Sequence, residues 1–326
     1  MPMTEPSPDR LPAYDELPRA ARGGRSAWGL FGPRDSAGLL NLQTPARVAA
    51  AARLIRSGET YSLNAPADVP GPPLFRRGEV RHTVIGSDAR AFFDDKLDDY
   101  YPQASSQWDS LAHIGYDADQ FYNGATADDV TTRARNTIDH WARRGIAGRA
   151  VLLDVDLALG GAGYGFDPAS PRAITVDELE AARAAAGVEW QPGDVLLLHT
   201  GFLGWYVRQR ADVREAMAEP GALRAVGLAH DETMARYLWN AHIAAIASDN
   251  PSLEVWPADL NDEAFPFGFL HRVLIGQFGM AVGELWWLED LARSCRRDGR
   301  YEMFLTSAPL NVPGGIGSPA NALAIK

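Results

Sequence analysis

The chain alternates segments of helical apolar spacing with short continuous apolar runs, which is the pattern of a sheet covered by helices. Helical segments are predicted at 44–58, 128–144, 175–187 and 231–240. Continuous apolar runs at 150–155, 194–199 and 243–248 predict buried strands, and two further strands are predicted at 60–64 and 80–85. This order predicts an α/β protein with a mostly buried sheet.

Local signals place the ends of three of these helices. Thr44 caps the first, Pro45 takes its first helical position, and Gly58 is expected to end it. A capping box formed by Thr175 and Glu178 starts the third, and Gly187 ends it. Asp231 caps the fourth.

Composition narrows the class of protein. The chain has 326 residues, of which 46% are hydrophobic, and this is enough for one large domain or two small ones. Its net charge of −11 does not favour binding to nucleic acid or to an anionic membrane. Cys295 is the only cysteine, which excludes an intramolecular disulfide and a cysteine-held zinc. Without a spanning apolar run or a signal peptide at the start, we expect a cytoplasmic protein that acts on small molecules.

The segment 103–113, Gln-Ala-Ser-Ser-Gln-Trp-Asp-Ser-Leu-Ala-His, concentrates polar chemistry beside aromatic and small residues. Asp109 and His113 are four positions apart, so on a helical turn they would share one face. An unpaired carboxylate is costly in an apolar setting, so Asp109 is predicted to bind a metal or a cationic partner. The alternative is that it caps a helix or accepts buried hydrogen bonds. His113 suits proton transfer near neutral pH, although a backbone-bonded core histidine is the alternative.

A second pair of candidates lies near the end of the chain. His271 and Glu284 flank an apolar stretch that Gly276 and Gly279 interrupt, which could bring the imidazole against the carboxylate. The alternatives are a solvated His271 and a Glu284 that starts a helix. His199, at the end of an apolar run, either lines a pocket or is a satisfied structural histidine.

The segment 103–113 resembles the metal-binding signature of the cyclase family of metal-dependent hydrolases, which includes kynurenine formamidases and isatin hydrolases. The similarity continues through Trp28–Gly32, Gly38–Pro45, Phe121–Gly124, Gln191–Gly201, His271–Gly276 and Gly283–Leu285, and so spans roughly residues 25–326. The resemblance implies one domain of swivelling β/β/α fold with a mixed sheet. Residues 1–24 are rich in Pro, Arg, Asp and Glu and have no apolar periodicity, so they are predicted to form a flexible arm before this domain. The resemblance also implies a homodimer or homotetramer.

By the same resemblance, Asp109, His271 and Glu284 ligate a metal and His113 is the catalytic acid and base. Ser106 stands where threonine is usual, while Gln103 and Gln107 replace two ligating histidines. Their amide oxygens could bind a hard cation, which they suit better than zinc, or the amides could hydrogen-bond a substrate. We prefer the role in substrate binding.

These residues together predict a metal-dependent hydrolase of an amide, cyclic imide or lactone that uses one divalent ion, manganese or zinc. Residues Gln103, Ser106, Gln107 and Trp108 are predicted to contact a small substrate, and the nearby aromatic side chains favour an aromatic or cyclic one. The alternatives are a natural-product cyclase or dehydratase, and a catalytically silent small-molecule-binding homologue.

Overall fold

The computed structural model describes residues 11–88, 91–160 and 166–326, and their main feature is a nine-stranded mixed sheet. In order across the sheet, its strands are β1 (Thr60–Ser62), β13 (Ala322–Ile325), β11 (Glu302–Ser307), β5 (Ile146–Asp154), β7 (Val195–His199), β9 (Ala245–Ser248), β10 (Ala281–Glu284), β4 (Gln107–Asp109) and β12 (Gly317–Pro319). The central strands β5, β7, β9 and β10 run parallel, and the neighbours on both sides are antiparallel. The predicted α/β fold with a buried mixed sheet is confirmed.

The continuous apolar runs of the sequence form the parallel centre of this sheet. Every residue of β7 and β9 is buried, as are all residues of β10. Both faces of a parallel sheet are covered, so these strands need apolar side chains on both sides instead of alternation. The strand predictions at 150–155, 194–199 and 243–248 correspond to β5, β7 and β9.

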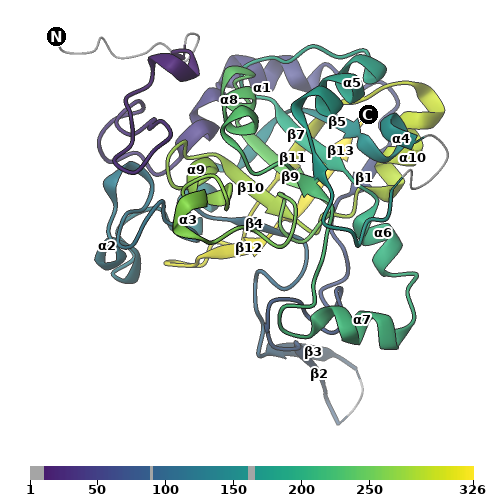
Figure 1. Ribbon diagram of the computed structural model, residues 1–326. Coiled ribbons are helices and arrows are strands. Elements are labelled where there is room, and N and C mark those ends of the chain that lie inside the picture. The colour runs from purple at the N-terminus through teal and green to yellow at the C-terminus, as the bar shows by residue number, and fades with distance from the viewer. Residues whose placement is uncertain (1–10, 89–90, 161–165) are drawn as a thin grey trace.

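Helices surround the sheet (Figure 1). They are α1 (Pro45–Ala52), α2 (Ala127–Thr131), α3 (Ile138–Arg144), α4 (Val155–Gly160), α5 (Val176–Ala186), α6 (Phe202–Tyr206), α7 (Ala211–Ala218), α8 (Glu232–Asn240), α9 (His271–Leu274) and α10 (Glu289–Asp298). Short 3-10 turns form at η1 (Tyr14–Glu16), η2 (Gly38–Leu42), η3 (Tyr122–Gly124) and η4 (Asp262–Ala264). Helix α1 packs on β5 and β11, and α5 packs on β5, α4 and α8. None of the helices in the described ranges is long and apolar enough to cross a bilayer.

The capping signals are confirmed at α1, α5 and α8. Thr175 accepts from the backbone N–H of Glu178, and Gly187 ends α5 in the left-handed conformation at φ 65°. Helix α1 begins at Pro45 as predicted but ends at Ala52, well before Gly58.

The single helix predicted over 128–144 is wrong, because this segment forms α2 and α3 with a break between them. Arg133 and Asn136 have positive φ values of 63° and 67° inside the break. The buried Asn136 amide donates to the carbonyl of Tyr122 at 2.8 Å. A long-range contact therefore overrides the local helical spacing.

The expected flexible arm is packed where the structure describes it. Tyr14 is fully buried, meets Phe278 edge to face with ring centroids 6.1 Å apart, and donates to Glu232 at 3.0 Å. Leu11 and Leu17 are also in the core. Residues 11–24 therefore belong to the folded body, while residues 1–10 of the predicted arm lie outside the described ranges.

A hairpin of β2 (Arg81–Gly86) and β3 (Phe93–Asp98) projects from the body (Figure 1). All of β2 is exposed, including Val84 and Ile85. The strand predicted at 80–85 is therefore present as part of an exterior hairpin instead of the main sheet. The remaining two strands, β6 (Ala173–Ile174) and β8 (Gly227–Leu228), pair in parallel with each other.

Candidate metal centre and active site

Strands β4 and β10 bring three polar side chains to one face of the sheet. Their antiparallel register places Gln107 opposite Glu284 and Asp109 opposite Val282. Because side chains alternate along a strand and paired residues share a face, Gln107, Asp109 and Glu284 point the same way. All three are buried, and the Gln107 amide donates to Glu284 Oε2 at 2.5 Å.

His271, the first residue of α9, completes the group. Its Nε2 lies 3.1 Å from Glu284 Oε1 and 3.8 Å from Asp109 Oδ2. One ligand atom from each of Asp109, His271 and Glu284 falls within 4.8 Å of the others. Two carboxylate oxygens and one imidazole nitrogen form a donor set that suits zinc or manganese.

Asp109 is the best indication that a cation belongs there. The side chain is fully buried, and neither carboxylate oxygen has a hydrogen-bond partner among the described residues. Burial raises the pKa of this carboxyl group, which nearby His113 and His271 oppose. An uncompensated buried carboxylate is expensive, and a bound divalent cation would remove that cost.

Glu254 orients the histidine and was not found from the sequence. Its Oε2 lies 2.7 Å from His271 Nδ1, so Nε2 is left to face Asp109 and Glu284. Burial alone would lower the pKa of His271, but Glu254 and Glu284 outweigh it and hold that pKa well above the ordinary value. A carboxylate on the second ring nitrogen is typical of metal-binding histidines. The sequence feature that could have identified Glu254 is its position between two apolar residues, Leu253 and Val255, which indicates a buried carboxylate.

His113 reaches the group from the segment after β4. Its Nε2 lies 3.7 Å from Asp109 Oδ1, and a quarter of the side chain is exposed. The two residues are not on a helical turn. Asp109 ends β4, and the backbone then turns between Ser110 and His113, whose N–H donates to the Ser110 carbonyl at 3.0 Å. The turn nevertheless brings the two side chains together. Partial exposure next to a buried carboxylate suits a group that exchanges protons.

The other predicted contact residues have different surroundings. Ser106 Oγ donates to the Leu285 carbonyl at 2.5 Å and accepts from the Ala65 N–H at 2.8 Å. Trp108 lies on the opposite face of β4, where its ring meets Trp286 at a centroid distance of 4.7 Å. The Gln103 carbonyl accepts from Arg77, and its side chain lies against Gly317. Of the four, only Gln107 is hydrogen-bonded to a member of the metal group.

A second buried polar cluster lies where parallel strands end. His199 Nδ1 is 3.0 Å from Asp154 Oδ1, and Nε2 is 3.5 Å from Glu289 Oε2 and 4.0 Å from Asp249 Oδ2. Arg296 donates to Asp154 at 2.6 Å. Although burial opposes the charge, these carboxylates raise the pKa of His199 to about 10. His199 therefore belongs to a buried ion network, which is the structural one of the two roles considered for it.

Comparisons with known proteins add to this geometry. A family model described as putative cyclase matches residues 66–255, more than half of the chain. A crystal structure described as a novel cyclase is 32% identical and superposes with a TM-score of 0.80, covering 92% of this chain and 99% of its own. No curated protein matches the chain.

Two isatin hydrolases share the fold at lower identity. Isatin hydrolase A from Labrenzia aggregata, bound to benzyl benzoate, is 16% identical with a TM-score of 0.58, over 87% of this chain and 98% of its own. Isatin hydrolase A from Ralstonia solanacearum is 20% identical with a TM-score of 0.57, over 86% of this chain and 97% of its own.

Proposed function

Because the chain belongs to the putative cyclase family, we propose that it is a metal-dependent hydrolase of an amide, cyclic imide or lactone. The observation that carries the proposal is the buried Asp109 carboxylate, without a hydrogen-bond partner in the described structure and converging with His271 and Glu284. A hydrolase of this kind needs a divalent ion beside a residue that transfers protons, and His113 lies next to the same carboxylate.

Asp109, Glu284 and Nε2 of His271 would hold one divalent ion, manganese or zinc. When bound, the ion supplies Lewis acidity that polarises the substrate carbonyl and favours ionisation of water. Glu254 holds the proton on Nδ1 of His271, which keeps Nε2 directed at the two carboxylates. Gln107 donates to Glu284 and limits the orientations of that carboxylate.

His113 is the proposed proton carrier. An imidazole can accept a proton from the attacking water and return it to the leaving nitrogen or oxygen. A quarter of its side chain is exposed, so a substrate could reach it from solvent. Gln103, Ser106 and Trp108 support the β4 segment through backbone and ring contacts, so we assign them to positioning.

Isatin hydrolases of the same fold support an aromatic or cyclic substrate. The family description favours ring formation as a second candidate reaction, which would use the same ion and the same proton carrier. Product analysis on a panel of N-formyl anilides, cyclic imides and lactones distinguishes bond cleavage from cyclisation.

Removal of the metal tests the proposal directly. We expect at most one tightly bound ion per chain in protein purified without chelator, because the family resemblance implies that Gln103 and Gln107 replace two ligating histidines. Glu284→Gln should remove the metal and the hydrolytic activity together, while the matched surface variant Glu215→Gln retains both. Full hydrolysis after exhaustive chelation, or two ions per chain by elemental analysis, would exclude this mechanism.

A further inference from the structure

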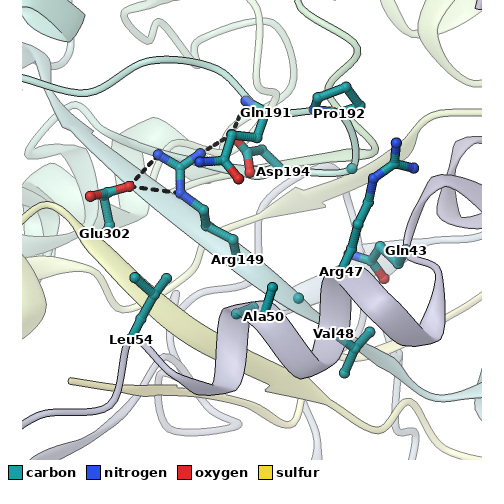
Figure 2. A pocket seen from close by; sticks show the side chains of 13 residues that line it. Gln43, Arg47, Val48, Ala50, Leu54, Arg149, Gln191, Pro192, Asp194 and Glu302 are labelled. Atoms are coloured by element: carbon teal, nitrogen blue, oxygen red, sulfur yellow. Dashed lines mark hydrogen bonds and ion pairs between the residues drawn. The ribbon is translucent and has the colours of Figure 1, made fainter. Parts of the chain in front are cut away.

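A cavity of about 380 Å³ lies between α1 and the amino ends of β5 and β7 (Figure 2). Gly148 and Arg149 of β5 and residues 191–194 before β7 form one side, and α1 forms the other. Glu284 of the metal group ends β10, which runs parallel with β7 through β9. The cavity and the metal group are therefore at opposite ends of the parallel strands.

Gln43 is the distinctive residue of this cavity. Only 4% of it is exposed, yet neither its amide oxygen nor its amide nitrogen has a hydrogen-bond partner in the parts of the chain that are described. Its backbone is anchored, because the carbonyl accepts from Arg144 at 3.1 Å. Each unsatisfied buried polar group costs roughly 1–3 kcal/mol. The carboxamide therefore carries one acceptor and one donor that are buried without a partner among the described residues.

Gly148 on β5 lies directly against the Gln43 amide. A Cβ atom there would lie 3.1 Å from Gln43 Nε2, closer than ordinary side-chain contacts. Glycine thus allows the carboxamide to lie against β5. Much of the remaining wall is aliphatic, with Val48 and Ala50 on α1 and Leu54 just after its end in Figure 2.

The charges around the cavity are engaged within the protein. Arg149 donates to Asp194 Oδ2 at 2.5 Å and to Glu302 Oε1 at 2.8 Å, as Figure 2 shows. Arg47 donates to the carbonyl of Leu42 at 2.9 Å. A ligand here does not have to supply a counter-charge, and its polar contacts would be made with Gln43.

We propose that this cavity binds a neutral ring compound with an amide edge, such as a lactam, a cyclic imide or a pyrimidinedione. The Gln43 oxygen would accept from the ring N–H and the Gln43 nitrogen would donate to the adjacent carbonyl. Open-chain secondary amides are trans and place these two groups on opposite sides, whereas a ring holds them on one edge. The aliphatic wall would contact the ring faces. This binding does not depend on the metal group.

Calorimetric titration with uracil tests the proposal, with 1,3-dimethyluracil as the matched compound that lacks both ring N–H groups. We expect saturable one-to-one binding of uracil to the full-length protein and at least tenfold weaker binding of the dimethyl compound. Gln43→Leu should weaken uracil binding at least tenfold without lowering the unfolding temperature, because the leucine leaves no unpaired amide. Gln209→Leu, a matched change away from the cavity, should bind like the wild type.

Two further variants locate the bound uracil. Ala50→Trp on the exposed side of α1 should fill the cavity and abolish binding while hydrolytic activity is retained. Glu284→Gln should bind uracil normally, whatever it does to hydrolysis. The proposal is overturned if uracil does not bind saturably, if dimethyluracil binds equally well, if Gln43→Leu and Ala50→Trp bind normally, or if Glu284→Gln abolishes binding.

Discussion

Asp109 shows how one residue constrains the chemistry of this protein. In a solvated loop its carboxylate would need no partner, but here it is fully buried beside Glu284 and His271. Burial raises the pKa of Asp109, and repulsion from the second buried acid, Glu284, raises it further. A bound divalent cation would reverse both effects.

His113→Asn tests the proton carrier. Asparagine is similar in size but cannot exchange a proton near neutral pH, so kcat should fall about 10²–10⁴-fold. Metal content should stay near the wild-type value, because the residue is not one of the three ligands. The control is the same change at His140 on α3, which contacts Thr137, and it should leave kcat unchanged. Wild-type kcat in His113→Asn would exclude its catalytic role.

Glu254→Gln tests the orientation of His271. The amide has nearly the same shape but loses the charge that holds the proton on Nδ1, so metal affinity should drop about 10–100-fold. Competition with a chromophoric chelator measures this affinity, and Glu215→Gln serves as the matched surface control. An unchanged affinity would mean that Glu254 only fills space beside the ring.

At the scale of secondary-structure elements, charged side chains at the carboxyl ends of β5, β7 and β9 form ion pairs with one another. Asp154 ends β5, His199 ends β7, and Asp249 follows β9, while Arg296 reaches them from α10. The Thr200 N–H and hydroxyl both donate to Asp249, at 2.7 and 2.8 Å. Each charge is paired, so breaking one contact leaves another buried and uncompensated.

This network predicts a pH dependence of stability. The folded protein binds the His199 proton up to a pKa of about 10, whereas the unfolded chain releases it near 6.5. The stabilisation is complete below pH 6.5 and is lost as the pH rises toward 10. Between pH 7 and 9.5 this residue should remove about 3 kcal/mol from the free energy of unfolding.

Urea denaturation at both pH values, compared between the wild type and His199→Gln, isolates this contribution. The wild type should lose more stability than the variant on going to pH 9.5. His230→Gln is the control and should follow the wild type. Equal losses in wild type and His199→Gln would show that His199 is neutral in the folded protein.

At the scale of the whole molecule, the β2–β3 hairpin leaves apolar side chains exposed in a single copy of the chain. This hairpin extends from the body with Val84, Phe93 and Leu97 on one face, all about half exposed or more, and Phe92 exposed just before β3. An isolated two-stranded hairpin is marginal in water, and clustered exposed apolar side chains are typical of interfaces. We therefore expect a homodimer or homotetramer in which another copy covers this hairpin.

Light scattering coupled to size exclusion tests the assembly. The wild type should be oligomeric at micromolar concentration, and the double variant Phe92→Asp with Phe93→Asp should shift it toward monomer. Val213→Asp on α7, also an exposed apolar position, should leave the mass unchanged. A monomeric wild type would contradict the expectation.

The sequence by itself determined the class of fold, the buried strands, three helix starts and the family. These features depend on local signals, namely continuous apolar runs at β7 and β9 and side-chain caps at Thr44, Thr175 and Asp231. The cyclase-family resemblance, carried by strings spread along the chain, is confirmed. It also singled out Asp109, His271 and Glu284, which the fold brings together.

Only the tertiary structure decided what depends on partners distant in the sequence. Asn136 broke a helix that local spacing favoured, because its amide reaches the carbonyl of Tyr122. Glu254 became part of the candidate site through a contact with a residue 17 positions away. Strand alternation turned Trp108 into the core, and the unpaired amide of Gln43 became visible only once burial was known. Burial, pairing and strand facing are properties of the folded chain, and local pattern does not encode them.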